Sequence, residues 1–140
     1  MIPYSRQSIN NKDIAEVVKV LRSDFLTQGP KVDIFEKKVS KFVKSKFAVA
    51  CNSATSALHL ACLALNLKSK DIVWTVPNTF VASANCAINC GAKIDFVDID
   101  KETWNISIKM LEKKLKIAKK KKKLPKILIP VHFAGQPTEQ

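Results

Sequence analysis

Apolar residues near the start of the chain recur at the spacing of amphipathic helices. Residues 14 to 21 place such side chains on one face, namely Ile14, Val17, Val18 and Leu21. Asn10, followed three residues later by Asp13, is typical of a helix start. A second helix is predicted to begin near Pro30, since proline suits a first helical position and the following residues again form one apolar face.

From residue 47 the pattern changes to short apolar runs separated by segments of helix length. The runs at 47–51, 72–76, 94–99 and 127–131 predict parallel strands. The segments at 56–67, 79–89 and 107–118 predict helices, and Gly91 stands where a helix would end. The order β-α-β-α-β-α-β predicts an α/β fold, with a mainly parallel sheet between helix layers. The helix at 56–67 is apolar on nearly all sides and is expected to be buried.

Length and composition agree with a folded protein rather than a disordered one. The chain has 140 residues, of which 46% are hydrophobic, which suits one domain or part of a larger one. Its start lacks a signal-peptide pattern, and no apolar run approaches the ~20 residues of a membrane span. We therefore expect a cytoplasmic protein with no membrane partner.

The charge is concentrated in one segment. Of the net +12, residues 109–126 contribute +9 through ten lysines and one glutamate. The run from Lys119 to Lys123 contains no aromatic residue, and arginines are rare, whereas nucleic-acid readers use arginine forks and stacking aromatics. The preferred interpretation is a solvated helix end followed by a loop, with no nucleic-acid partner. A basic nucleic-acid-binding module remains the alternative.

No metal site is expected from the potential ligands. The cysteines lack the paired C-x-x-C spacing of zinc sites and stand in apolar stretches, so buried structural thiols are predicted at Cys51, Cys62, Cys86 and Cys90. Three acidic residues surround the end of the third predicted strand, namely Asp95, Asp98 and Asp100. Asp98 and Asp100 alternate with Ile99 and are interpreted as shaping a turn. His59 is predicted to be a core or interface residue, and His132, at a strand end, is the better functional candidate.

Ligands of open α/β sheets bind beyond the carboxyl ends of the strands, which places two segments of interest there. Residues 53–56 offer hydroxyls and backbone N–H groups at a predicted helix start, where unpaired donors and the helix dipole favour a phosphate. An ordinary serine or threonine helix cap explains the same residues equally well. Phe80 either stacks on a planar cofactor ring or fills the core, and composition alone favours the core.

Other phosphate-binding and hydrolytic signatures are missing from the sequence. With glycine only at positions 29, 91 and 135, the chain contains neither G-x-G-x-x-G nor a P-loop. It also lacks the G-x-S-x-G elbow of α/β hydrolases. Dinucleotide, ATP-binding and serine-hydrolase functions are therefore disfavoured.

Several segments together resemble the DegT/DnrJ/EryC1/StrS family of sugar aminotransferases, which have the pyridoxal-phosphate fold type I. SATSAL from Ser53, VDID from Val97 and PVHFAG from Pro130 recur across that family. SDFLTQGP from Ser23 and TFVASANCA from Thr79 resemble the branch that serves pseudaminic acid and surface glycan biosynthesis. The similarity extends along nearly the whole chain.

The resemblance implies a cofactor, a reaction and a set of site residues. The cofactor would be pyridoxal 5'-phosphate, with its phosphate at Ala54, Thr55 and Ser56 and its ring stacked on Phe80, where many relatives carry tryptophan. Thr27 would lie near the substrate, a UDP-linked 4-keto-6-deoxy amino sugar. Glutamate would be the amino donor, and the full-length enzyme would be a homodimer.

The resemblance also implies that this chain holds only part of the machinery. Residues 1–140 would be the first part of the large, cofactor-binding domain, with the rest of that domain and a small carboxyl-terminal domain absent. The lysine that forms the Schiff base would lie beyond Gln140, so no catalytic residue is assigned and the chain alone is expected to be inactive. A sugar dehydratase, in which histidine replaces that lysine, another nucleotide-sugar aminotransferase and a non-catalytic dimerisation fragment remain alternatives.

Overall fold

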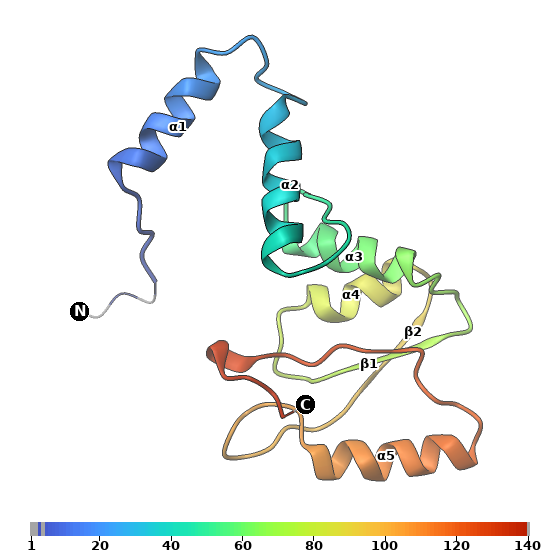
Figure 1. The fold of residues 1–140 in the computed structure, drawn as a ribbon. Helices are drawn as coiled ribbons and strands as arrows, with labels where there is room; N and C mark the ends of the chain where they lie inside the picture. The colour runs from blue at the N-terminus through green and yellow to red at the C-terminus, as the bar shows by residue number, and fades with distance from the viewer. Residues whose placement is uncertain (1–2, 4, 140) are drawn as a thin grey trace. The chain divides into compact units, whose positions relative to one another are not determined.

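The described residues form two compact units. The computed structural model describes residue 3 and residues 5–139, and its contacts separate Met1–Ala50 from Cys51–Gln140. The first unit contains α1 (Asn11–Leu21) and α2 (Pro30–Phe42), shown in blue to teal in Figure 1. None of the helices in the described part of the chain is long and apolar enough to cross a membrane.

Both helices of the first unit begin where the sequence predicts. Asn10 Oδ1 accepts hydrogen bonds from the backbone N–H groups of Lys12 at 2.8 Å and Asp13 at 3.3 Å. Asp13 Oδ2 in turn accepts from the backbone N–H of Asn10 at 2.9 Å, which completes a capping box. Pro30 is the first residue of α2, where its missing N–H costs nothing.

The predicted strand at 47–51 is wrong. This segment pairs with no other strand in the described part of the chain, and the sheet has three strands rather than four. The backbone N–H of Ala50 donates instead to Glu36 Oε1 at 2.7 Å. A strand needs a neighbouring backbone to complete its hydrogen bonds, and an apolar run alone does not supply one.

The second unit is built on a small parallel sheet. Its strands are β1 (Ile72–Thr75), β2 (Lys93–Phe96) and β3 (Ile127–Leu128), in the order β2-β1-β3. Trp74 on the central strand is in register with Asp95 on one side and Leu128 on the other. The β1–β3 pairing continues past the end of β3, because the backbone N–H of Ile129 donates to the Trp74 carbonyl at 2.8 Å. The Thr75 hydroxyl adds a bond to the Ile129 carbonyl at 2.9 Å.

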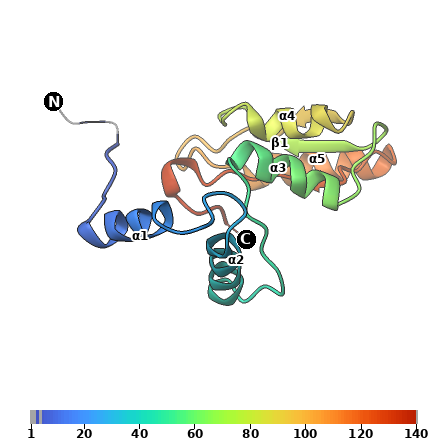
Figure 2. The same ribbon diagram turned by 90° about the horizontal axis from the view of Figure 1, so that it is seen from above.

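Helices cover both faces of this sheet, as Figures 1 and 2 show. The helices α3 (Ala54–Ala64) and α4 (Ala82–Asn89) lie on one side and α5 (Ile108–Lys120) on the other. Val73 belongs to the apolar cluster shared with α3 and α4, and Trp74 to the cluster on the α5 side. The α/β class with helix layers around a parallel sheet is thus confirmed.

The expected burial of the first of these helices is wrong for most of its surface. Cys62 is the one fully buried residue of α3, and Leu58 packs partly against the same cluster. Leu63, by contrast, is 52% exposed. Only the side of α3 that faces α4 and the sheet is covered within the described unit, although the helix is apolar on nearly all sides.

The cysteines are partly as predicted. Cys62 and Cys86 are buried, Cys90 is half-buried, and Cys51 is exposed. Burial, helped by a hydrogen bond with Cys86, raises the pKa of the Cys62 thiol to about 12. A thiol that stays protonated at neutral pH is a poor nucleophile, which fits a structural role.

The lysine-rich segment lies at a helix end, as its pattern predicts. The helix α5 ends at Lys120, and Lys119 and Lys120 form its last turn. Lys122 has a positive φ of 52°, and residues 119–123 are all exposed. Cations there interact favourably with the partial negative charge at the carboxyl end of the helix.

A first prediction concerns Gly91, which ends α4 with a φ of +73°. Its N–H donates to the Ile88 carbonyl at 2.8 Å, and the N–H of Ala92 donates to Ala87 at 3.0 Å, closing the helix end. An added Cβ meets nothing closer than 3.6 Å, so the cost of substitution is conformational. Gly91→Ala should lower the free energy of unfolding by about 1 kcal/mol, measured by denaturant titration. Gly91→Asn is the matched control and should cost less, because asparagine tolerates this conformation; equal losses would contradict the explanation.

Candidate functional site

Loops gather at one edge of the sheet in the second unit, because the strands are parallel and their carboxyl ends point the same way. The segments that follow β1, β2 and β3 start from this edge, called here the carboxyl edge. In Figures 1 and 2 the first turn of α3 and the 3₁₀ turn η1 (Phe133–Gly135) lie toward the same end of the sheet. Ligands of open α/β sheets bind at such an edge.

The first turn of α3 contains the helix cap that the sequence offered as one alternative. Ser53 has an extended backbone, and its Oγ accepts a hydrogen bond from the backbone N–H of Ser56 at 3.2 Å. The Ser56 hydroxyl donates to Asn52 Oδ1 at 2.8 Å. Ser56 therefore already uses its N–H and its hydroxyl within the protein.

The cap leaves room for an anion at the same helix start. In the described part of the chain, the backbone N–H groups of Ala54 and Thr55 donate to no protein acceptor, and both residues are exposed. These N–H groups and the Thr55 hydroxyl stand at the positive end of the α3 dipole. The arrangement suits a phosphate, with Ala54 and Thr55 as the free donors and Ser56 as a residue that shapes the turn.

Phe80 does not fill the core of the second unit. It stands just before α4 in the segment that follows β1, and it is 74% exposed. The segment around it is held by a 2.8 Å hydrogen bond between the hydroxyls of Thr79 and Ser83. Composition alone favoured the core, and the structure overturns that expectation. The residues of the adjoining α4 that are buried are Ala82, Ser83, Cys86 and Ala87.

Of the two acidic residues after β2 that were predicted to shape a turn, Asp100 does so. Asp100 Oδ1 accepts from the backbone N–H groups of Glu102 and Thr103, each at 3.0 Å. The hydrogen bond from Thr103, which has the larger effect, and that from Glu102 lower the pKa of the Asp100 carboxyl from its usual value. Across the described residues, no three side chains of the metal-ligating kinds gather closely enough to hold an ion.

Asp95 forms an ion pair with Lys114. Lys114 on α5 reaches across to Asp95 Oδ2 at 2.7 Å, hydrogen-bonds the Phe96 carbonyl, and lies 4.8 Å from the centroid of the Trp74 ring. Partial burial works to raise the pKa of Asp95, but hydrogen bonds from Lys114 and from the Phe96 backbone outweigh it, so that pKa is lowered. Asp95 thus fastens α5 to the sheet.

The two histidines lie in different surroundings. His59 is half-buried on α3. His132 is exposed at the end of the β3 segment, and its Nδ1 accepts a hydrogen bond from the backbone N–H of Thr138 at 3.0 Å. Of the two, only His132 stands at the carboxyl edge.

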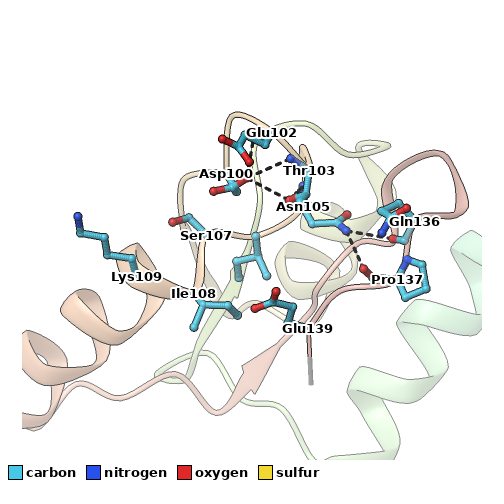
Figure 3. Close-up of a pocket in the computed structure, with 11 residues that line it drawn as sticks. Asp100, Glu102, Thr103, Asn105, Ser107, Ile108, Lys109, Gln136, Pro137 and Glu139 are labelled. Atoms are coloured by element: carbon cyan, nitrogen blue, oxygen red, sulfur yellow. Dashed lines mark hydrogen bonds between the residues drawn. The ribbon is translucent and has the colours of Figure 1, made fainter.

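One residue of this edge gave no signal in the sequence. Asn105 is only 4% exposed, and its side chain bonds the segment at 133–137, as Figure 3 shows in part. Beside it lies a cavity of about 330 Å³ between residues 100–109 and 136–139. A single asparagine in a loop is common, so only the approach of a distant segment reveals its role.

Thr27 lies in the other unit. It is exposed in the loop between α1 and α2, next to Gln28, which has a φ of +51°. A Cβ at Gly29 would lie 3.0 Å from Phe25 Cβ and 3.1 Å from the Phe25 carbonyl oxygen, so a larger residue there would have to displace Phe25 by a few tenths of an ångström. The second unit holds the other predicted site residues, Ala54, Thr55, Ser56 and Phe80.

Comparison with known proteins supplies the family. The profile of the DegT/DnrJ/EryC1/StrS aminotransferase family matches residues 7–140. A UDP-4-amino-4,6-dideoxy-N-acetyl-beta-L-altrosamine transaminase of Campylobacter jejuni subsp. jejuni serotype O:23/36 (strain 81-176) is 50% identical over 115 residues. That alignment covers 82% of this chain and 30% of the relative.

Solved structures of aminotransferases are also similar to this chain. PseC of Helicobacter pylori, an aminotransferase involved in the biosynthesis of pseudoaminic acid, superimposes with a TM-score of 0.81 at 32% identity, covering 98% of this chain and 36% of that one. A Streptococcus pneumoniae protein assigned as a sugar aminotransferase, in its PLP form, gives 0.83 at 32% identity, covering 99% and 34%. The chain thus spans about a third of the length of the proteins it matches.

A second prediction concerns the Asp95–Lys114 pair. Lys114→Met should lower the free energy of unfolding at pH 7 by less than about 1 kcal/mol, since the Asp95 side chain is 55% exposed and solvent screens the pair. Because the folded-state pKa of Asp95 is lowered, its contribution is fully present above the unfolded pKa of about 3.9 and is lost as the pH falls through the folded pKa. The difference from the wild type should therefore shrink below about pH 4.

Denaturant titrations between pH 7 and pH 3 measure this difference. Lys113→Met is the matched control, because Lys113 is the exposed neighbour on α5. A difference for Lys114→Met that stays constant down to pH 3 would assign its effect to the Trp74 contact and the Phe96 hydrogen bond rather than to Asp95.

Proposed function

Because the chain belongs to the DegT/DnrJ/EryC1/StrS aminotransferase family, we propose that it is part of the cofactor-binding domain of a sugar aminotransferase that uses pyridoxal 5'-phosphate. The observation that carries this proposal is the first turn of α3. There the backbone N–H groups of Ala54 and Thr55 have no acceptor among the described residues, and the exposed Thr55 adds a hydroxyl. A PLP form is known for one of the structural relatives.

The described residues fit the phosphate of this cofactor. Ala54 and Thr55 would donate their backbone N–H groups to phosphate oxygens, and Thr55 would add its hydroxyl. Ser56 would contribute by holding the turn, since its N–H is bonded to Ser53 and its hydroxyl to Asn52. Charge-assisted hydrogen bonds from such donors are stronger than those to neutral acceptors.

Phe80 fits the ring of the cofactor. An exposed aromatic side chain in the segment that leaves the central strand offers a flat apolar face, and stacking would remove that face from water. When bound, pyridoxal 5'-phosphate supplies the carbonyl that takes up an amino group and the conjugated ring that stabilises negative charge beside it. The part of Phe80 would be to hold the ring in one plane and exclude water from that side.

We propose the reaction from the relatives' activities. Glutamate would give up its amino group and leave as 2-oxoglutarate, and the 4-keto carbon of a UDP-linked 6-deoxy amino sugar would become the 4-amino carbon. The Campylobacter jejuni relative bears the name of a UDP-sugar transaminase, and the Helicobacter pylori structure is described as serving pseudoaminic acid synthesis. Thr27, in the exposed loop before α2, would contact the sugar nucleotide.

We further propose that residues 1–140 form the first part of a large domain and that the lysine handling the amino group belongs to another part of the protein. The chain's coverage of about a third of each relative supports this. The active form would be a cytoplasmic homodimer. The 140-residue chain by itself would not transaminate.

The third prediction tests the reaction. The protein expressed from its complete gene, incubated with the UDP-linked 4-keto-6-deoxy sugar and glutamate, should produce the 4-amino sugar and 2-oxoglutarate in equal amounts, measured by mass spectrometry. Residues 1–140 alone are the control and should give no amine. A deoxygenated sugar without 2-oxoglutarate would instead indicate the related dehydratase chemistry, and no change in the sugar would refute the proposal.

The fourth prediction tests the phosphate site. Thr55→Val keeps the size of the side chain and the backbone N–H but removes the hydroxyl donor, so the dissociation constant for pyridoxal 5'-phosphate should rise roughly tenfold or more. Absorbance titration of the apo form of the complete protein measures it. Thr55→Ser retains the hydroxyl and should stay close to the wild type. Equal affinities for Thr55→Val and the wild type would place the phosphate elsewhere.

A further inference from the structure

Asn105 joins two loops of the carboxyl edge through its side chain. Its Nδ2 donates to the carbonyls of Gln136 and Pro137, each at 3.0 Å, and its Oδ1 accepts from the backbone N–H of Phe133 at 2.9 Å. Figure 3 shows the two donated bonds. Both amide hydrogens are used and the side chain is almost completely buried, so the carboxamide is committed to this one arrangement.

The segment it holds, the turn at 132–138, has a conformation that needs outside support. Ala134 has a φ of +50° and Gly135 a φ of +84°. Within the turn, the N–H groups of Gly135 and Gln136 donate to the carbonyls of His132 and Phe133 at 3.1 and 2.9 Å. A left-handed alanine is unfavourable by itself and persists only where neighbouring contacts fix it.

Aromatic and amide contacts join the same two loops. Trp104, next to Asn105, stacks on Phe133 with ring centroids 5.8 Å apart and planes at 19°. Asn78, from the segment after β1, donates to the Trp104 carbonyl at 2.8 Å. The turn at 132–138 is therefore tied to the loops that follow both other strands.

This support fixes the chemical form of His132. Because Nδ1 accepts the N–H of Thr138 at 3.0 Å, it carries no proton, and the neutral ring must carry its proton on Nε2. Thr138 is buried, whereas His132 is exposed. His132 thus offers Nε2–H as a hydrogen-bond donor at the carboxyl edge.

We propose that His132 is a ligand-binding residue, whose Nε2–H donates to an acceptor oxygen of the bound sugar nucleotide or of the cofactor, and that Asn105 is the positioning residue that holds it there. This inference rests on the proposed function only in the identity of the ligand. The bonds that hold the turn are a property of the fold.

The first experiment measures the turn without reference to activity. Asn105→Ala and Asn105→Asp, in the complete protein, should speed amide hydrogen exchange across 132–138 by at least about tenfold, because one side chain supplies three of its bonds. The aspartate cannot donate to the two carbonyls. Asn85→Ala, exposed on α4, is the control and should leave this peptide unchanged. Unchanged exchange in the Asn105 variants would overturn the positioning role.

The second experiment separates the two nitrogens of His132. Asparagine places its amide near the position of Nδ1 and glutamine places its amide near Nε2. His132→Asn keeps an acceptor for Thr138 but loses the ligand donor, so it should weaken binding of UDP-N-acetylglucosamine or of pyridoxal 5'-phosphate by about tenfold. His132→Gln should stay within about threefold of the wild type. Separate titrations of the two probes identify which ligand receives the bond.

A double substitution tests whether Asn105 acts through His132. Asn105→Ala should weaken the same probe, and combining it with His132→Asn should weaken binding no further, because residues that act through one another are not additive. The proposal would be overturned if His132→Asn bound both probes with wild-type affinity. It would also be overturned if the loss of affinity in the double variant equalled the product of the two single losses.

The outcomes are distinguishable from failure of the proposed function. If the wild type forms no amine but the titrations respond as expected, the reaction is misassigned and the role of His132 stands. If amine forms at the normal rate and His132→Asn binds both probes like the wild type, the reaction stands and the role of His132 falls.

Discussion

The central strand β1 is closed off from water on both faces, and the rest of the second unit is arranged around it. Val73 and Thr75 are wholly buried and Trp74 nearly so, and Val76, which follows the strand, is wholly buried as well. Their peptide groups must find partners in the protein, since an unpaired buried group is costly. The strands β2 and β3 supply partners along both edges, and helices on both sides exclude water from the faces.

Polar groups that could bind a ligand are consequently found where this strand ends. Just beyond Thr75, Asn78 and Phe80 leave the buried layer, and the corresponding loops of β2 and β3 do the same. Because all three strands run in one direction, their loops meet and can support one another through Asn78, Trp104 and Asn105. The edge offers pre-arranged donors at the start of α3 and at His132.

Some apolar surface of the second unit, unlike the strand β1, stays exposed to water. The helix α3 has more apolar side chains than one face of a helix can bury, and in the described chain only the side toward α4 and the sheet is covered. Phe80 is likewise exposed despite its apolar ring. Under the proposed function, stacking on the cofactor would account for Phe80, and further protein surface would account for the open side of α3.

What the sequence determined by itself depends on neighbours within a few residues. The helix starts at Asn10 and Pro30, the helix end at Gly91 and the turn at Asp100 were all predicted, since each is decided by local hydrogen bonds or local backbone conformation. The resemblance to the family likewise rested on short motifs, each of which is a run of neighbouring residues. The anion-binding character of the α3 start was left open beside the serine cap. The structure contains the cap together with two backbone N–H groups that have no acceptor among residues 3 and 5–139.

Tertiary structure alone decided the features that need a distant partner. Whether 47–51 forms a strand depends on a neighbouring backbone, and the burial of α3 and the exposure of Phe80 depend on what covers them. Asn105 meets residues 28 to 32 positions later in the chain, a pairing that no local pattern announces. The type of an apolar or amide side chain determines which interactions it can make, but only the fold determines which partners lie close enough to make them.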